Sequence, residues 1–186
     1  MTHFKGKVIL ITGGTGSLGK ELAKTFLYQG CKVRIFSRNE SLQHEMKEKF
    51  NNSNIKFFLG DVRDKQRVYR AMENVDFVIH AAALKHVDAG EYNPFEFINT
   101  NVLGSQNIID CCIEREVNHC IAISSDKAVN PTGVYGATKL LMEKIFLAAS
   151  NIKGSHKTKF ACIRLGNLFN SSGSVVQKFK VQDKLQ

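Results

Sequence analysis

The sequence lacks three features that would place it in other classes of protein. No apolar run approaches the roughly 20 residues that a membrane-spanning helix needs, and residues 1–7 lack the long apolar segment of a secretory signal. Five cysteines occur, but none are spaced as the CxxC pair of a metal or redox site. We therefore expect a cytoplasmic protein with no membrane partner and no metal, whose cysteines are reduced core residues.

The positive charge is also not distributed as in a nucleic-acid-binding protein. The 186-residue chain carries a net charge of +9, but residues 151–186 hold seven Lys or Arg against one Asp, which leaves +3 for the first 150 residues. Nucleic-acid sites more often show a basic stripe interleaved with aromatic residues. We therefore interpret the positive charge of the chain as attracting a phosphate-bearing small molecule.

A glycine-rich turn follows the first predicted strand, residues 7–11, and precedes a helical pattern of apolar residues from Leu22 to Leu27. Its GxxGxxG spacing allows a tight turn, a close backbone approach to a pyrophosphate and a close helix–strand contact. The order strand, glycine turn, helix favours a dinucleotide site over a plain structural turn. The candidate cofactor residues here are Gly13, Gly14, Thr15, Gly16, Ser17, Leu18 and Gly19.

The second predicted strand, residues 32–36, ends in Ser37, Arg38 and Asn39, where the adenosine ribose of a dinucleotide would lie. An acidic residue at this place would accept a hydrogen bond from the 2′-hydroxyl of NAD. A hydroxyl and a guanidinium suit a 2′-phosphate instead, so the sequence favours NADP, with NAD still possible. The alternative is that Arg38 is a solvated charge at the strand end.

Further cofactor candidates follow the third and fourth predicted strands. Asp61, followed by Val62, could accept a hydrogen bond from the adenine amino group, whereas Asp64 is expected to cap a helix. The small side chains of residues 81–83 would let a cofactor pass close to the backbone. This second set of candidates is Asp61, Val62, Ala81, Ala82, Ala83 and Lys85.

Three more polar residues in this region are open to interpretation. His86 is a weak catalytic candidate because it has no evident partner, and His80 is expected to satisfy a buried backbone group. Asn99 interrupts the apolar face of a predicted long helix, residues 94–115, and is a candidate for an interior hydrogen bond that braces the active site.

The fifth predicted strand, residues 120–123, leads to a group of residues suited to hydride transfer. Tyr135 and Lys139 are four residues apart in a predicted helix over residues 135–149, which places them on one face. The ammonium can then stabilise a phenolate, whose free pKa is about 10. Ser125, at the neighbouring strand end, could share a hydrogen bond with a substrate hydroxyl.

Asp126 and Lys127 suggest chemistry beyond simple redox. A carboxylic acid and an amine in a partly dry site can serve as general acid and general base in an elimination, provided that the surroundings draw each pKa toward neutrality. The alternative is a surface ion pair on a loop.

The repeated βα units, with a sixth strand over residues 159–165 and no low-complexity tract, predict an α/β fold with a doubly wound parallel sheet. In combination with the glycine turn, this is a Rossmann fold that binds NAD or NADP.

Several motifs together resemble a known family. The chain is similar to the extended short-chain dehydrogenase/reductases, and within them to the inverting UDP-N-acetylglucosamine 4,6-dehydratases that begin pseudaminic acid synthesis and the related CapD-type polysaccharide biosynthesis proteins. The motifs are TGGTGSLG at residues 12–19, FSRNE at 36–40, GDVRD at 60–64, HAAALKHVDAGEYNPFE at 80–96, NTNVLG at 99–104, SSDKAVNPTGVYGATK at 124–139 and RLGNLFNSSGSVV at 164–176.

The resemblance implies roles for five side chains. Tyr135, Lys139 and Ser125 would oxidise the sugar at C4, with hydride passing to NADP. Lys127 would then remove the C5 proton, and Asp126 would protonate the departing C6 hydroxyl. Hydride return to C6 and reprotonation at C5 from the opposite face would give an inverted 4-keto-6-deoxy sugar.

The resemblance also implies substrate contacts and partners. Lys85, Asn167 and Ser125 would contact the substrate, UDP-N-acetylglucosamine or a similar nucleotide sugar, and residues 168–172, beginning with Leu168, would lie near the nicotinamide. A full-length member is expected to be a homo-oligomer.

Two departures from the family pattern matter, one at Ser125 and one after Val176. Ser125 stands where the family often has Thr, and Tyr135 stands where the retaining, membrane-anchored relatives tend to have Met, so the inverting group fits better. After Val176 the sequence leaves the pattern, which predicts an NADP-binding domain with the catalytic residues over 1–176, a tail over 177–186 and a C-terminal substrate lobe largely absent. A nucleotide-sugar 4-epimerase and a truncated, non-catalytic NADP-binding protein are the alternatives.

Overall fold

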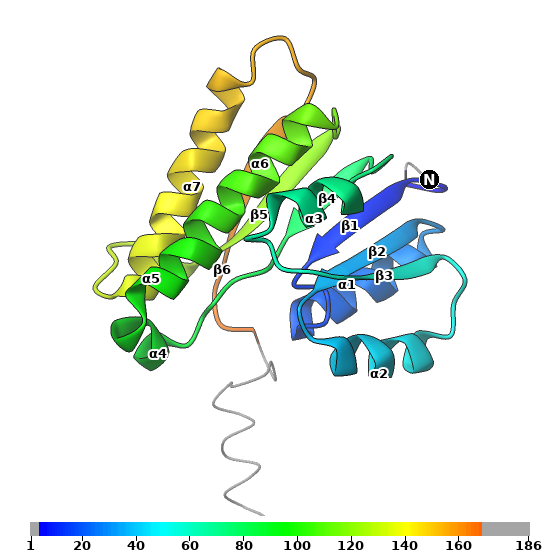
Figure 1. Ribbon diagram of the computed structural model, residues 1–186, viewed down its shortest axis with the longest axis horizontal. Coiled ribbons are helices and arrows are strands. Elements are labelled where there is room, and N and C mark those ends of the chain that lie inside the picture. Colours follow the sequence, from blue (N-terminus) through cyan, green and yellow to red (C-terminus); the bar gives the residue numbers. More distant parts are fainter. Residues whose placement is uncertain (1–3, 169–186) are drawn as a thin grey trace, which may run out of the picture.

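Six strands form one parallel sheet in the computed structural model, which describes residues 4–168 (Figure 1). The strand order, β3-β2-β1-β4-β5-β6, reverses direction between β1 and β4. This order confirms the predicted doubly wound α/β sheet and its Rossmann-like form. The strands are β1 (Val8–Thr12), β2 (Lys32–Ser37), β3 (Ile55–Leu59), β4 (Phe77–His80), β5 (His119–Ser125) and β6 (Lys159–Leu165).

Helices cover both faces of the sheet because successive strand residues point to opposite sides (Figure 1). Ile9 and Ile11 of β1 are buried in a cluster that includes Ala23 of α1 and Met46 of α2. Leu10, between them, is buried in a second cluster with residues of α3, α6 and α7. These helices are α1 (Ser17–Tyr28), α2 (Glu40–Phe50), α3 (Lys65–Ala71), α6 (Gly104–Glu114) and α7 (Val134–Ile152).

The segment after β4 is a series of short helices. The predicted helix over residues 94–115 is present, but α5 (Pro94–Phe97) and α6 are joined by a π-helical stretch, η1 (Ile98–Leu103). A shorter helix, α4 (Val87–Tyr92), precedes them, and a 3₁₀ turn, η2 (Asp126–Ala128), follows β5. A π turn widens the helix and changes which residues face inward, which affects the site described below.

Two helices begin at side-chain caps, of which the one at Asp64 was predicted from the sequence. Asp64 caps α3, because its carboxylate accepts a hydrogen bond of 2.9 Å from the backbone nitrogen of Arg67. Asn39 caps α2 in the same way, accepting from Leu42 at 2.9 Å. Within residues 4–168, no helix has the length and apolar character required to cross a membrane.

The first βα turn depends on a contact between two glycines. A Cβ atom on Gly19, in α1, would lie 2.5 Å from the Cα of Gly14, and one on Gly14 would lie 2.9 Å from side-chain carbons of Ile35. The absence of both side chains therefore allows α1 to pack directly on the turn and on the sheet.

We expect Gly19→Ala to lower the free energy of unfolding by about 1–3 kcal/mol, because the new methyl group meets backbone atoms that cannot rotate away. Urea denaturation followed by circular dichroism measures the change. Gly166→Ala is the matched control, since a Cβ there meets no atom within 4 Å. Equal stability of the two variants would contradict this account of the turn.

Candidate functional site

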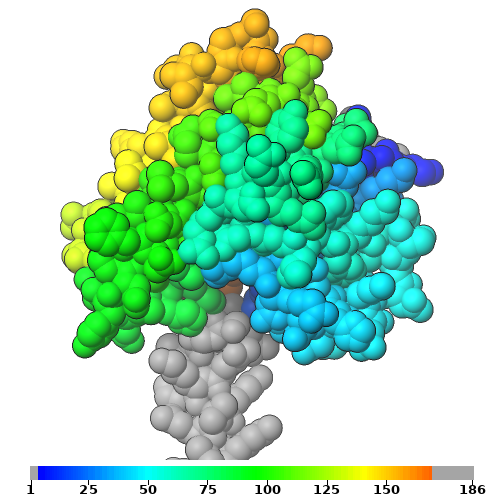
Figure 2. All heavy atoms as spheres, in the orientation of Figure 1, coloured from blue at the N-terminus to red at the C-terminus, as the bar shows by residue number. Residues whose placement is uncertain are grey.

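A cavity of about 800 Å³ opens at the carboxyl ends of the strands. Its lining comes from the loops that follow all six strands, and it lies across the β1–β4 reversal, where doubly wound folds place their ligands. In Figure 2 the surface is hollowed at the lower edge, between the green and blue parts of the chain. The strand order thus accounts for the location of the cavity.

The glycine turn forms one wall. Gly13 has a φ of +66°, and a Cβ there would lie 2.8 Å from the backbone of Ala81 and Ala82, so a side chain at this position would fill the crevice. α1 begins at Ser17 beside the cavity, where the positive end of the helix dipole favours an anion. These features fit a dinucleotide pyrophosphate. The predicted cofactor residues that line this wall are Gly13, Thr15, Gly16, Ser17, Leu18 and Gly19.

Only some of the residues predicted to contact the adenosine half of the cofactor line the cavity. Ser37, Arg38 and Val62 line it, but Asn39 does not, because its side chain caps α2. Asp61 and Gly14 are also outside the lining: Gly14 packs against Ile35, as described above.

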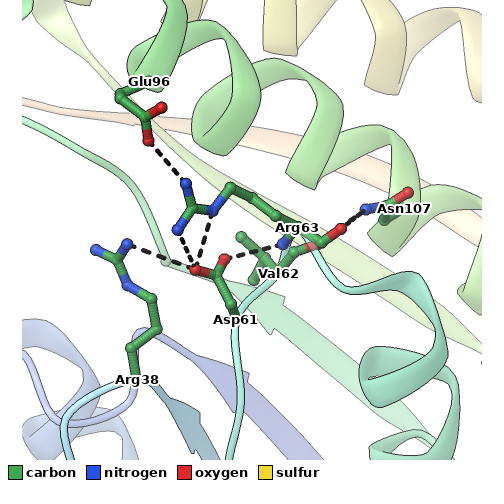
Figure 3. Close-up of polar contacts among 6 residues, drawn as sticks. All are labelled: Arg38, Asp61, Val62, Arg63, Glu96 and Asn107. Carbon is green, nitrogen blue, oxygen red and sulfur yellow. Dashed lines mark hydrogen bonds and ion pairs between the residues drawn. The ribbon is translucent and has the colours of Figure 1, made fainter. Parts of the chain in front are cut away.

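The Asp61 carboxylate is held by arginines (Figure 3). It accepts hydrogen bonds from the backbone nitrogen, Nε and Nη2 of Arg63, and lies 3.6 Å from Nη1 of Arg38. Partial burial alone would raise the pKa of Asp61, but the hydrogen bonds from Arg63 and the two positive charges lower it overall. The residue therefore carries a permanent negative charge beside the cavity rim.

A third wall follows β4 and contains the small residues 81–83 with Lys85, His86 and Val87. It is held by a buried chain of hydrogen bonds. The hydroxyl of Thr12 is 2.7 Å from Nδ1 of His80 and also accepts from the backbone nitrogen of Ala82. Nε2 of His80 lies 2.9 Å from the hydroxyl of Ser105, which itself donates to a backbone carbonyl.

Because the Ser105 hydroxyl gives its one proton to a carbonyl, it accepts from His80, so the ring carries a proton on Nε2. Complete burial, with the nearby charge of Lys139, lowers the pKa of His80 to about 3, so it stays neutral. The prediction that His80 satisfies a backbone group is wrong: its partners are the hydroxyls of Thr12 and Ser105. The ring thus links β1, β4 and α6 beneath the cavity.

The brace predicted at Asn99 is formed by Asn101 instead. Asn101 is 1% exposed, and its amide accepts from the backbone nitrogen of Leu84 and donates to the carbonyl of Leu84 and the hydroxyl of Thr138. Thr138 in turn donates to the carbonyl of Tyr135. The π turn presents Asn101 to the interior, and the resulting bonds tie the β4 loop to the first turn of α7.

Tyr135 and Lys139 both line the cavity from α7. Lys139 is 4% exposed and donates a 2.6 Å hydrogen bond to the carbonyl of Ile123, at the end of β5. Burial lowers its pKa to about 8. A buried amine of this kind can change its protonation near neutral pH, which suits a group that supports a phenolate.

Two residues that the sequence analysis missed hold α7 in place. Glu91 of α4 accepts a 2.9 Å hydrogen bond from the backbone nitrogen of Val134, one residue before Tyr135. Glu143, one turn after Lys139 and 5% exposed, makes a double hydrogen bond with Arg164 of β6 at 2.9 and 2.8 Å. Neither contact had a local signal in the sequence, because the partners are 43 and 21 residues apart in the chain.

Ser125, Asp126 and Lys127 lie together at the end of β5 and also line the cavity. The Ser125 hydroxyl donates to Asp126 at 2.9 Å, and Lys127 Nζ donates to the other carboxylate oxygen at 2.8 Å. These two bonds lower the pKa of Asp126. The condition that the surroundings draw this carboxyl toward neutrality is not met in the structure, where the two residues form the half-exposed ion pair given above as the alternative.

The last wall follows β6. Asn167 and Leu168, predicted to lie near substrate and nicotinamide, line the cavity beside Leu165. The predicted contacts at residues 169–172 and the predicted boundary at 176 lie outside the described residues. Among residues 4–168, no three His, Cys, Asp or Glu side chains come together in a group able to hold a metal ion.

The fold, the glycine turn and the cavity at the strand reversal define a Rossmann-like domain of the short-chain dehydrogenase/reductase class. A family described as polysaccharide biosynthesis protein matches residues 9–185. The chain belongs to this CapD-like family. Because the match extends to residue 185, the prediction that the sequence leaves the family pattern after Val176 is wrong.

Two curated relatives illustrate the activities found among similar chains. A UDP-N-acetylglucosamine 4,6-dehydratase (inverting) from Campylobacter jejuni subsp. jejuni is 55% identical over 179 residues, which cover 95% of this chain and 54% of the relative. A UDP-glucose 4-epimerase from Rickettsia rickettsii is 42% identical over 186 residues, covering 97% of this chain and 54% of the relative. The chain thus spans about half the length of these curated relatives.

Solved structures agree with the fold. The structure of Pen from Bacillus thuringiensis superposes with a TM-score of 0.96 at 45% identity, covering 99% of this chain and 59% of that one. A UDP-glucose 4-epimerase from Brucella ovis in complex with NAD superposes with a TM-score of 0.75 at 24% identity, covering 87% and 52% of the two chains, and this likeness supports the fold alone.

The depressed pKa of Lys139 predicts a pH dependence of stability. Its pKa falls from 10.5 to about 8 on folding, so between these values the unfolded chain binds more protons and the free energy of unfolding rises with pH. Relative to Lys139→Met, the wild-type chain should gain up to about 1.4 kcal/mol per pH unit between pH 8 and pH 10. Urea denaturation across this range measures the difference, and a pH-independent difference would contradict the assignment.

Proposed function

We propose that the chain forms the NADP-binding and catalytic part of a C5-inverting UDP-N-acetylglucosamine 4,6-dehydratase. The observation that carries the proposal is that one cavity is lined by the glycine turn, by Tyr135 and Lys139, and by the Asp126–Lys127 pair. The 55% identity to an inverting dehydratase supports the same assignment. Residues 1–176 would supply the cofactor site and the catalytic groups.

The first half of the proposed reaction oxidises the sugar at C4. NADP, when bound, supplies the hydride acceptor for C4 and the donor for C6. Tyr135 takes the proton of the C4 hydroxyl, and the buried ammonium of Lys139 stabilises the phenolate that this requires. Ser125, at the end of β5, orients the same hydroxyl by a hydrogen bond.

The second half removes water across C5 and C6. In the open cavity Lys127 and Asp126 are joined by a 2.8 Å hydrogen bond as a charged pair. A bound sugar excludes water, which penalises both charges and favours transfer of the shared proton from the ammonium to the carboxylate. This one transfer produces a neutral amine and a neutral acid, the two forms that the elimination needs.

The pair then acts on neighbouring carbons of the sugar. The Lys127 amine takes the C5 proton, which the C4 ketone has made acidic, and the Asp126 carboxyl donates its proton to the C6 hydroxyl, which leaves as water. After these steps Lys127 is again an ammonium and Asp126 a carboxylate. The ion pair in the described structure is thus the resting state of the proposed cycle.

NADP is the proposed cofactor because Arg38 stands at the cavity rim, where the adenosine ribose would lie. The substrate contacts proposed for Lys85 and Asn167 rest on their place in the cavity wall beside the catalytic groups.

A nucleotide-sugar 4-epimerase is the second candidate, favoured by the 42% identity to a protein named UDP-glucose 4-epimerase. An epimerase would use Tyr135 and Lys139 in the same way. It has no step that requires an acid and a base at C6 and C5, so the Asp126–Lys127 pair favours the dehydratase.

The test is to incubate UDP-N-acetylglucosamine and NADP with the chain, and with a version extended to the length of the curated relatives, and to follow products by NMR. We expect a 4-keto-6-deoxy sugar from the extended protein. A simple 4-epimer would refute the dehydratase and support the second candidate. NADP binding by the short chain without turnover would place the remaining substrate contacts outside it.

The role of Lys127 has a separate readout. In D₂O, the extended protein should exchange the C5 proton for deuterium, and Lys127→Ala should slow this exchange by about 10²–10⁴-fold because it removes the base. Lys144→Ala, an exposed lysine on α7, is the matched control and should leave exchange unchanged. Exchange at the wild-type rate in Lys127→Ala would show that another group is the base.

A further inference from the structure

Four charged side chains of alternating sign form a chain at the cavity rim: Arg38, Asp61, Arg63 and Glu96 (Figure 3). Arg38 follows β2, Asp61 and Arg63 follow β3, and Glu96 belongs to α5. Only Arg38 of these four lines the cavity. The other three can therefore affect a ligand in the cavity only through the position and the pairing of Arg38.

The two arginines share Asp61 very unequally. Arg63 makes hydrogen bonds of 2.9, 2.9 and 2.7 Å to the carboxylate through its backbone nitrogen, Nε and Nη2. Arg38 approaches the same carboxylate only to 3.6 Å, which is longer than a hydrogen bond, and half of its side chain is exposed. Arg63 thus satisfies the Asp61 carboxylate, and the N–H groups of the Arg38 guanidinium can donate to another acceptor.

Arg63 is itself fixed from two sides. Its Nη1 donates a 2.7 Å hydrogen bond to Glu96. The amide of Asn107, on α6, donates to the backbone carbonyls of Val62 and Arg63 at 3.0 and 3.1 Å. Because backbone and side chain are both tethered, Arg63 holds Asp61 in one position.

We propose that Arg63 is a positioning residue that sets the preference for a 2′-phosphorylated dinucleotide over an unphosphorylated one. By pairing with Asp61 it neutralises a carboxylate that would otherwise repel the phosphate and compete for Arg38. The inference rests on the proposed use of NADP and names the residue that makes Arg38 effective.

The physical reason is a balance of charge around Arg38. With Arg63 present, Asp61 is already satisfied and Arg38 can form a charge-assisted, two-pronged contact with a phosphate. Without Arg63, Asp61 is left beside Arg38 with no other cation among its described contacts, so the two should pair directly. Pairing of Arg38 with Asp61 would weaken the binding of NADP, which carries the 2′-phosphate dianion, far more than the binding of NAD, which carries a 2′-hydroxyl.

The test measures dissociation constants of NADP and NAD by calorimetry for the chain and its variants. We expect Arg63→Met to reduce the ratio of NAD to NADP dissociation constants by about tenfold, mainly through weaker NADP binding. Arg70→Met, which removes an exposed arginine from α3, is the matched control and should leave the ratio unchanged. Arg63→Lys keeps the charge but not the paired contact. Its ratio of dissociation constants should lie between those of the unaltered chain and Arg63→Met.

A double-mutant cycle separates positioning from direct contact. If Arg63 acts through Arg38, adding Arg63→Met to Arg38→Met should change the ratio no further. An equal loss in both backgrounds would mean that Arg63 binds the phosphate itself and would overturn the proposal.

Two other outcomes count against the proposal in different ways. If Arg38→Met abolishes the preference for NADP but Arg63→Met leaves it intact, the positioning role is wrong and the cofactor assignment stands. If the unaltered chain binds NAD more tightly than NADP, both the cofactor assignment and the inference are wrong. Thermal unfolding of each variant confirms that the comparison is made between folded proteins.

Discussion

The reversal of strand order between β1 and β4 is the constraint on which the site depends. It leaves a crevice between the loops that follow these strands, and the parallel arrangement brings the carboxyl ends of all six strands to the same edge. The neutral ring of His80 joins β1 to β4 and α6 below the crevice. The glycine turn after β1 and the loop after β5, far apart in the sequence, therefore face one cavity.

Buried polar groups fix the geometry around that crevice. Asn101 ties the β4 loop to α7, Glu91 binds the first turn of the same helix, and Glu143 anchors its next turns to Arg164 of β6. The contacts of Asn101 and Glu143 satisfy buried polar groups that would be costly to leave unpaired, whereas Glu91 binds α7 from the surface. Together they hold α7, and with it the two side chains proposed for hydride transfer, against the end of β5.

The sequence predicted the strands, most of the helices and the residues that line the cavity, because these depend on local patterns of glycine, apolar and strand-end residues. It did not distinguish a side chain that faces the cavity from one that caps a helix, as Asn39 does. It placed the interior brace at Asn99, since the π turn that presents Asn101 has no clear sequence signature. The partners of Arg63 and Glu91 are 33 and 43 residues away in the chain, so only the fold reveals them.

The central claim is that the cavity holds a dinucleotide with its nicotinamide against Tyr135 and Lys139. A crystal structure of the chain with NADP tests it most directly. The account predicts the pyrophosphate at the glycine turn, the 2′-phosphate on Arg38 and the nicotinamide beside Tyr135 and the end of β5. A dinucleotide bound elsewhere, or a cavity left empty at saturating NADP, would contradict it.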